Sequence, residues 1–214
     1  MSTRTGSNSA IFSTNQKYYI NTFSNISTPT LITLNDNRGK ELTTLLDNSK
    51  LKAQTAQLNM PQKEFFTFRT SSGVELNGWM MKPANFNANK KYPVILHQYS
   101  GPGSQQVIDR WGIGSFGDGG LFEAYMCDKG YIMVCVDGRG TGGRGAAFEK
   151  CTYLQLGVKE AEDQVETARY LGTLPYIDGK RIGIWGWSFG GYNTLMSMSD
   201  GSGAFKAGVA IAAP

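Results

Sequence analysis

A serine flanked by glycines, directly after a short apolar run, is the feature that most constrains this chain. The run is Arg-Ile-Gly-Ile-Trp at 181–185, and Gly-Trp-Ser-Phe-Gly-Gly follows at 186–191. This order predicts a strand, a sharp turn and a helix, with Ser188 in a strained backbone conformation and its hydroxyl exposed. Residues 192–199 can continue as a helix whose N-terminal amides point to the place where an oxyanion would form. Ser188 is therefore predicted to be the nucleophile of an acyl-transfer reaction.

The alternative interpretation is a glycine-rich turn without chemistry, because the chain carries 27 glycines among 214 residues. The motif alone is weak evidence. The apolar run before it, the helix-compatible run after it and a second apolar strand predicted at 206–212 favour the catalytic interpretation, since structural context is what confirms such a motif.

A catalytic base is not evident in the sequence. In α/β-hydrolases an acid and then a histidine follow the nucleophile along the chain. The residues after Ser188 include one acidic side chain, Asp200, and no histidine. The single histidine, His97, lies upstream in an apolar run at 94–99, where a core role is favoured over proton transfer. We therefore expect a chain that is truncated after the nucleophile and the next strand, and that has negligible hydrolytic activity alone.

Composition sets the broad class of the protein. With 40% hydrophobic and 12% aromatic residues, the chain has enough apolar side chains for a packed core. The formal charge of +4 arises from 21 basic and 17 acidic residues that are scattered along the sequence, so no nucleic-acid partner is predicted. No membrane span, metal site or cofactor is predicted either, and the polar start at 1–8 lacks the apolar core of a signal peptide.

Three cysteines, Cys127, Cys135 and Cys151, leave at least one thiol unpaired. Cys135 and Cys151 flank a glycine-rich loop and could form a bridge in an oxidising compartment, although packed free thiols are the favoured interpretation.

The first region of the chain reads as short strands at 17–24, 30–34 and 42–46, which are separated by turns. Three strands cannot bury an apolar face alone, so we interpret them as part of a larger all-β domain such as one blade of a propeller. A β extension of the following domain is the alternative. Residues 49–61 are expected to be a linker.

The second region alternates between strands and helices. A hairpin is predicted at 64–69 and 74–81, followed by apolar strands at 93–99, 131–137, 181–185 and 206–212. A helix is predicted between the second and third of these strands, where apolar residues recur at helical spacing: Val158, Ala161, Val165, Ala168 and Leu171. This alternation predicts a mostly parallel sheet that is covered on both faces, as in the α/β-hydrolase core.

One competing motif is Gly-Arg-Gly-Thr-Gly-Gly at 138–143, which fits the dinucleotide-binding pattern G-x-G-x-x-G. No helix signature begins at its third glycine, and no acidic residue ends a following strand about 20 residues on, as ribose binding requires. We interpret residues 137–145 as a structural loop near the active face, with Arg139 paired to a carboxylate.

Several motifs resemble the catalytic domain of the prolyl oligopeptidase family of serine peptidases. They are Asp-Gly-Arg-Gly at 137–140, Glu-Asp-Gln at 162–164 and the whole segment 181–192. Within this family, Tyr-Ser-Gly-Pro-Gly-Ser-Gln at 99–105 and the Gly-Trp-Ser form of the turn are similar to the dipeptidyl peptidase IV branch, which includes bacterial prolyl tripeptidyl peptidases.

The resemblance implies a β-propeller domain, of which residues 1–59 would hold the last strands and the linker, and an α/β-hydrolase domain from residue 60 to 214. It also implies the release of short peptides from a free N-terminus, typically after proline. Ser188 matches the nucleophile, and Tyr99 matches the tyrosine whose hydroxyl forms the oxyanion hole with the backbone N–H of Phe189. Family members are often homodimers, and a bacterial parent enzyme would lie in the periplasm or the cell envelope.

Departures from the family pattern leave several questions open. Phe189 replaces the tyrosine that is common in this branch and so lacks a hydroxyl. The triad acid and histidine, the glutamates that hold the substrate amino group and most of the proline pocket have no matching positions, so dipeptide and tripeptide release are both possible. An esterase or lipase is an alternative function, although such enzymes often carry a His-Gly-Gly loop. A non-catalytic truncated product is another.

Overall fold

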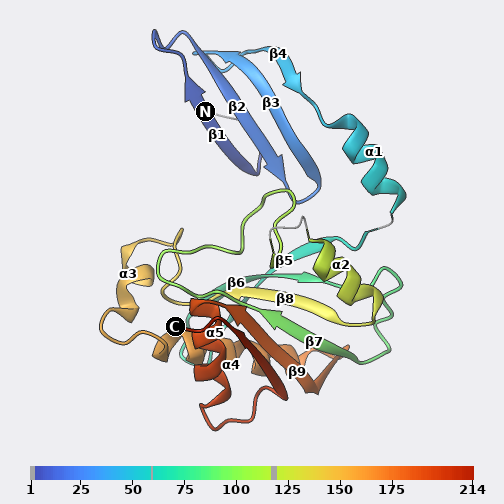
Figure 1. Cartoon of the computed structure of the whole chain (residues 1–214), viewed down its shortest axis with the longest axis vertical. Helices are drawn as coiled ribbons and strands as arrows, with labels where there is room; N and C mark the ends of the chain where they lie inside the picture. Colours follow the sequence, from blue (N-terminus) through green and yellow to red (C-terminus); the bar gives the residue numbers. More distant parts are fainter. Residues whose placement is uncertain (1–2, 59, 117–119) are drawn as a thin grey trace. The chain divides into compact units, whose positions relative to one another are not determined.

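The computed structural model describes residues 3–58, 60–116 and 120–214, which form two compact units (Figure 1). The first unit comprises Met1–Gln62 together with Ile108–Leu121, and the second comprises Lys63–Val107 together with Phe122–Pro214. That Ile108–Leu121 groups with the first unit was not predicted from the sequence. Among the described residues, no helix combines the length and apolar character that a membrane crossing requires.

An antiparallel sheet with the strand order β1-β2-β3-β4 forms the first unit. Its strands are β1 (Ser7–Phe12), β2 (Tyr18–Asn25), β3 (Thr28–Asp36) and β4 (Glu41–Leu46). The three predicted strands correspond to β2, β3 and β4. β1 was not predicted, because its sequence, Ser-Asn-Ser-Ala-Ile-Phe, begins with three polar residues and shows no alternation. The segment expected to be a linker holds helix α1 (Ser49–Gln57), which has no buried residue.

Polar contacts attach Asp109 and Trp111 to the strands of the first unit. The carbonyl oxygen of Asp109 accepts from the N–H and the hydroxyl of Ser7, each at 2.9 Å. The carboxylate of Asp109 accepts from the N–H of Ile26 at 2.9 Å, and the N–H of Trp111 donates to the hydroxyl of Ser24 at 3.3 Å. The start of the segment that follows Val107 is thereby hydrogen-bonded to β1, to β2 and to the turn after β2.

A six-stranded sheet with the order β10-β9-β7-β8-β6-β5 forms the centre of the second unit (Figure 1). The strands are β5 (Lys63–Arg69), β6 (Glu75–Met81), β7 (Tyr92–His97), β8 (Ile132–Asp137), β9 (Ile177–Trp187) and β10 (Ala207–Ile211). β10, β9, β7 and β8 are parallel, while β6 pairs antiparallel with β8 and with β5. The predicted hairpin and the predicted parallel strands are confirmed.

Helices pack on both faces of this sheet. α4 (Val158–Thr173) and α5 (Phe189–Met198) lie on one face, and α2 (Leu121–Asp128) lies on the other. A short helix α3 (Ala146–Glu149) and a 3-10 turn at Lys150–Thr152 connect β8 to α4. The predicted apolar face of α4 is buried except for Val158, which is exposed because it is the first residue of the helix.

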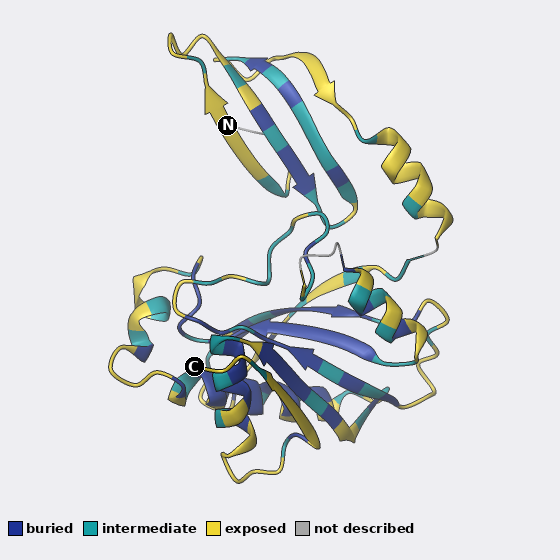
Figure 2. Cartoon of the chain, in the orientation of Figure 1, coloured by how far each residue is buried: buried dark blue, intermediate teal, exposed yellow. Residues whose placement is uncertain are grey.

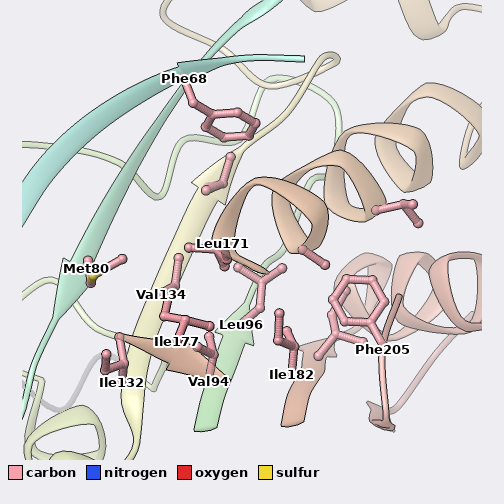
Figure 3. Close-up of a cluster of buried hydrophobic side chains, with 14 of the residues drawn as sticks. Phe68, Met80, Val94, Leu96, Ile132, Val134, Leu171, Ile177, Ile182 and Phe205 are labelled. Atoms are coloured by element: carbon pink, nitrogen blue, oxygen red, sulfur yellow. The ribbon is translucent and has the colours of Figure 1, made fainter. Parts of the chain in front are cut away.

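The larger hydrophobic cluster fills the space between the sheet and α4 (Figure 3). Leu96, Val134 and Ile182 project from the strands, and Leu171 projects from α4. All six residues of β8 are buried, as expected for a central parallel strand, and Figure 2 shows the contrast with the exposed strands β1 and β4. This core holds β7 and β9 side by side, and their carboxyl ends carry the candidate site.

Candidate active site

Ser188 occupies the turn between β9 and α5 in a strained backbone conformation. Its φ of 55° and ψ of −121° lie in a region that side chains other than glycine rarely adopt. Its N–H donates to the carbonyl oxygen of Ile211 at 2.9 Å, and its carbonyl accepts from the N–H of Tyr192 at 3.1 Å. The predicted strand, turn and helix are confirmed, and Ser188 is half-buried at the N-terminus of α5.

The glycines of the motif are required by close backbone contacts. A methyl group at Gly186 would lie 2.5 Å from the carbonyl oxygen of Gln98, and one at Gly190 would overlap the same oxygen. A methyl group at Gly191 would lie 2.8 Å from the carbonyl oxygen of Ile211. The turn is therefore wedged between the ends of β7 and β10, which explains how the strain at Ser188 is maintained.

Tyr99 lies beside this turn. In the parallel pairing of β7 with β9, His97 is opposite Trp185, so two further residues along each strand bring Tyr99 level with the turn. The rings of Tyr99 and Phe189 have their centroids 6.4 Å apart. The three residues predicted from the sequence, Ser188, Tyr99 and Phe189, are thus brought together at the carboxyl ends of β7 and β9.

The N-terminus of α5 can supply backbone donors to an anion. Phe189 is the first helical residue, so its N–H has no acceptor within the helix. The aromatic ring of Phe189 packs edge-on against Tyr192 with a centroid separation of 5.5 Å. Tyr192 in turn donates its hydroxyl to the carbonyl oxygen of Leu156 at 3.1 Å, which ties the first turn of α5 to the segment that precedes α4.

An open apolar hollow of about 980 Å³ lies on that same segment. It is lined by Pro102, Glu149, Lys150, Thr152, Tyr153, Leu154 and Leu156. Leu156 therefore links the hollow to Tyr192, and through Tyr192 to the helix that begins after Ser188.

The glycine-rich loop after β8 is structural. The N–H groups of Gly140 and Gly142 donate to the carbonyl oxygens of Phe148 and Ser104, at 3.0 and 2.8 Å. A methyl group at Gly142 would lie 2.7 Å from the carbonyl oxygen of Gly103. These amides are already engaged with neighbouring backbone, so the geometry does not favour a phosphate-binding role for residues 138–143.

Arg139 in this loop is paired with two carboxylates of α4. Its guanidinium donates to Asp163 at 2.7 Å and to Glu162 at 3.0 Å, and its backbone N–H also donates to Asp163. The bonds to Asp163 raise the pKa of Arg139 above its usual value. The predicted pairing is confirmed. Asp163 is fully buried, and this pairing satisfies its charge there.

Asp137, at the end of β8, holds a second loop in place. Its carboxylate accepts from the N–H groups of Gln106 and Val107 at 2.9 and 2.8 Å. Burial nevertheless raises its pKa to about 6, because desolvation of the charged form outweighs the two hydrogen bonds. Asp137 thus supports the loop that follows Tyr99.

His97 is placed as a core residue. It is 5% exposed, and its ring lies 4.8 Å from that of Trp185. Burial, with a smaller effect of the charge on Lys63, lowers its pKa to about 4. Among the described residues, Nδ1 of His97 has no hydrogen-bond partner and the ring makes no hydrogen bond to Ser188. This environment favours a neutral structural imidazole, in agreement with the interpretation from the sequence.

All three cysteines are free thiols. Burial raises the pKa of Cys127 to about 12 and that of Cys135 well above its usual value, which keeps both protonated. Cys151 donates to the carbonyl oxygen of Phe148. The bridge between Cys135 and Cys151 that the sequence left open does not form here.

Gln98 contacts the turn directly, a role that was not predicted from the sequence. The residue is 1% exposed, and its side-chain amide donates to the carbonyl oxygen of Gly190 at 2.7 Å. The available signal was an uncharged amide at the end of an apolar run, immediately before Tyr99. Burying a side-chain amide without a hydrogen bond lowers the stability of the fold, so an amide at this position indicates a hydrogen-bond partner.

Together these features define an α/β protein with a strained serine at a strand-to-helix turn. Comparison with known families identifies it more closely, because residues 121–214 match the model of the Prolyl oligopeptidase family. This match confirms the resemblance to that family that was inferred from the motifs.

Individual relatives point to one branch. A probable dipeptidyl peptidase 4 of Aspergillus flavus is 40% identical over 209 residues, which are 96% of this chain and 26% of that protein. The crystal structure of Porphyromonas gingivalis dipeptidyl peptidase 4 has a TM-score of 0.93 and 50% identity, and covers 99% of this chain and 29% of that one. The crystal structure of a putative dipeptidyl aminopeptidase IV from Bacteroides ovatus has a TM-score of 0.86 and 38% identity. The match covers 97% of this chain and 29% of that one.

The chain spans between about a sixth and a quarter of the length of such curated relatives, from 17% to 26%.

Proposed function

We propose that this chain is the nucleophile-bearing part of a serine exopeptidase that releases dipeptides from free N-termini, typically after proline. The observation that carries the proposal is Ser188 itself, held at φ 55° at the N-terminus of α5 with Tyr99 beside it. The names of the relatives support dipeptide release over tripeptide release.

In the proposed reaction, Ser188 Oγ attacks the scissile carbonyl carbon and forms an ester with the released dipeptide. The proton of Ser188 passes through a base to the leaving amine, and water then hydrolyses the ester. The negative oxygen of each tetrahedral intermediate accepts hydrogen bonds from the N–H of Phe189 and the hydroxyl of Tyr99. His97 is a poor base for this step, since it is buried against Trp185 and makes no hydrogen bond to Ser188 among the described residues.

The finer architecture belongs to the same proposal. We propose that residues 60–214 form the N-terminal part of an α/β-hydrolase domain and that residues 1–59 form the last strands of a β-propeller with a linker. The six-stranded, mostly parallel sheet and the antiparallel sheet of the first unit support this division. A second copy of the protein as partner, and a location in the periplasm or cell envelope, follow from the family alone.

Hydrolysis of Gly-Pro-p-nitroanilide by the native protein that carries this sequence tests the proposal. We expect turnover that Ser188→Ala abolishes, whereas Ser202→Ala, in an exposed turn, keeps it. A p-nitrophenyl ester and an Ala-Ala-Pro anilide serve as competing substrates. Preference for the ester would favour an esterase, and undiminished peptide hydrolysis by Ser188→Ala would refute the assignment.

A further inference from the structure

Gln98 connects the end of β7 to the first turn of α5 through its backbone. Its N–H donates to the carbonyl oxygen of Trp185 at 3.2 Å, which extends the pairing of β7 with β9 by one residue. Its own carbonyl oxygen occupies the space that a side chain at Gly186 or Gly190 would need. The backbone of Gln98 therefore touches both ends of the serine turn.

The side chain of Gln98 makes a second connection to the same helix. Nε2 donates to the carbonyl oxygen of Gly190 at 2.7 Å and to the hydroxyl of Thr194 at 3.1 Å, while Oε1 accepts from Nδ2 of Asn193 at 3.0 Å. Thr194 also donates its hydroxyl to Gly190 at 2.8 Å. Gln98, Asn193 and Thr194 are each at most 1% exposed, so the network is shielded from water. One side chain thus holds three residues of α5.

The position of Gln98 in the chain makes this network relevant to catalysis. Tyr99 follows Gln98 directly, and Phe189 directly precedes Gly190. The bond between Gln98 and Gly190 therefore lies one residue away from each of the two proposed oxyanion donors. We propose that Gln98 is a positioning residue that fixes the Tyr99 hydroxyl and the Phe189 N–H relative to each other. This inference rests on the proposed function, and Gln98 itself does not contact the substrate.

A purely structural role would have a different consequence. Buried polar networks specify one arrangement of the elements they join, in addition to satisfying hydrogen bonds. If Gln98 only filled and satisfied the core, replacing it would lower stability and leave the turnover number unchanged. If it sets the spacing of the two donors, its loss weakens an interaction that exists only in the transition state, so kcat falls while KM is retained.

The experiment compares variants of the native protein on Gly-Pro-p-nitroanilide. Gln98→Met keeps the length of the side chain and removes its polar atoms, and Gln98→Glu keeps an acceptor for Asn193 but removes the donor to Gly190. We expect kcat to fall tenfold or more in both variants, with KM within twofold of wild type. The affinity of a dipeptide boronic acid, whose tetrahedral adduct places an oxygen in the same hole, should fall by the same factor as kcat/KM.

Two further variants separate the possible failures. Asn35→Leu removes a buried side-chain amide in the first unit whose hydrogen bonds to described residues all lie within β3. It should lower the melting temperature while kcat is kept. Full activity of Ser188→Ala would refute the proposed function itself. If Ser188→Ala is inactive, the Gln98 variants decide the positioning role. That role is wrong if both variants keep kcat within twofold of wild type, if they raise KM without lowering kcat, or if they fail to fold.

Discussion

At the scale of single residues, the backbone at Ser188 is held in a conformation that costs about 1–3 kcal/mol and persists only because its surroundings enforce it. The hydrogen bond to Ile211 fixes the N–H of Ser188, and close contacts at Gly186 and Gly190 fix the chain on either side. The strain is thus enforced from two neighbouring strands, and the Ser188 side chain makes no hydrogen bond that caps α5.

Tyr99→Phe tests the oxyanion assignment at the level of one oxygen atom. The substitution removes the hydroxyl and leaves the ring against Phe189, where the centroids are 6.4 Å apart. Loss of one such donor costs about 3 kcal/mol in the transition state, so kcat should fall about a hundredfold with little change in KM. Steady-state kinetics of the native protein measures both constants. An unchanged kcat with a raised KM would make Tyr99 a pocket residue.

Gly190→Ala tests the packing of the turn. The added methyl group would overlap the carbonyl oxygen of Gln98, a backbone atom that can move only with β7. Overpacking of this kind costs about 1–3 kcal/mol, and we expect a lower melting temperature together with loss of turnover. Gly172→Ala in α4 is the matched control, because the nearest atom to its methyl group would be 3.8 Å away. Equal melting temperatures for the two variants would contradict the packing account.

At the scale of elements, the strands and helices with a clear pattern of apolar residues could be predicted from the sequence. Those without such a pattern could not. β7, β8 and α4 follow from runs of apolar residues, and the turn at Ser188 follows from its glycines. β1 is stabilised by pairing with β2 over six residues, which the sequence of β1, half polar and without alternation, does not reveal. Burial of Asp163 also could not be predicted, because it depends on Arg139, which lies 24 residues earlier in the chain.

The titration of Asp137, at the end of β8, should make the free energy of unfolding depend on pH. Its pKa is about 6 in the folded protein against an ordinary 3.8, so the folded state binds a proton more readily than the unfolded state. This group therefore stabilises the fold as the pH falls from about 6 to about 4, by about 3 kcal/mol, and that stabilisation is lost as the pH rises through 6.

Asp137→Asn removes this titration and leaves the N–H groups of Gln106 and Val107 with a single, uncharged acceptor oxygen at all pH values. Denaturant unfolding between pH 4 and pH 7 should show a flatter pH dependence for the variant than for wild type, so that the difference in their free energies of unfolding changes with pH. Parallel curves for wild type and variant would mean that Asp137 has an ordinary pKa.

At the scale of the whole molecule, the site could be predicted only in part. Ser188, Tyr99 and Phe189 belong to motifs that are continuous in sequence, and the structure brings them together. Gln98 acts through Gly190, 92 residues later, and no local pattern reports a contact at that separation. The role of His97 could not be settled from the sequence either, because its burial against Trp185 is what distinguishes a core imidazole from a base.

The central claim is that Ser188 is the nucleophile of a serine peptidase. A fluorophosphonate reacts covalently with an activated serine hydroxyl, and mass spectrometry of the digested native protein locates the adduct. We predict one adduct on Ser188, formed in proportion to the loss of Gly-Pro-p-nitroanilide hydrolysis, and none in Ser188→Ala. Complete inhibition with the adduct on another residue, or with Ser188 unmodified, would contradict the claim.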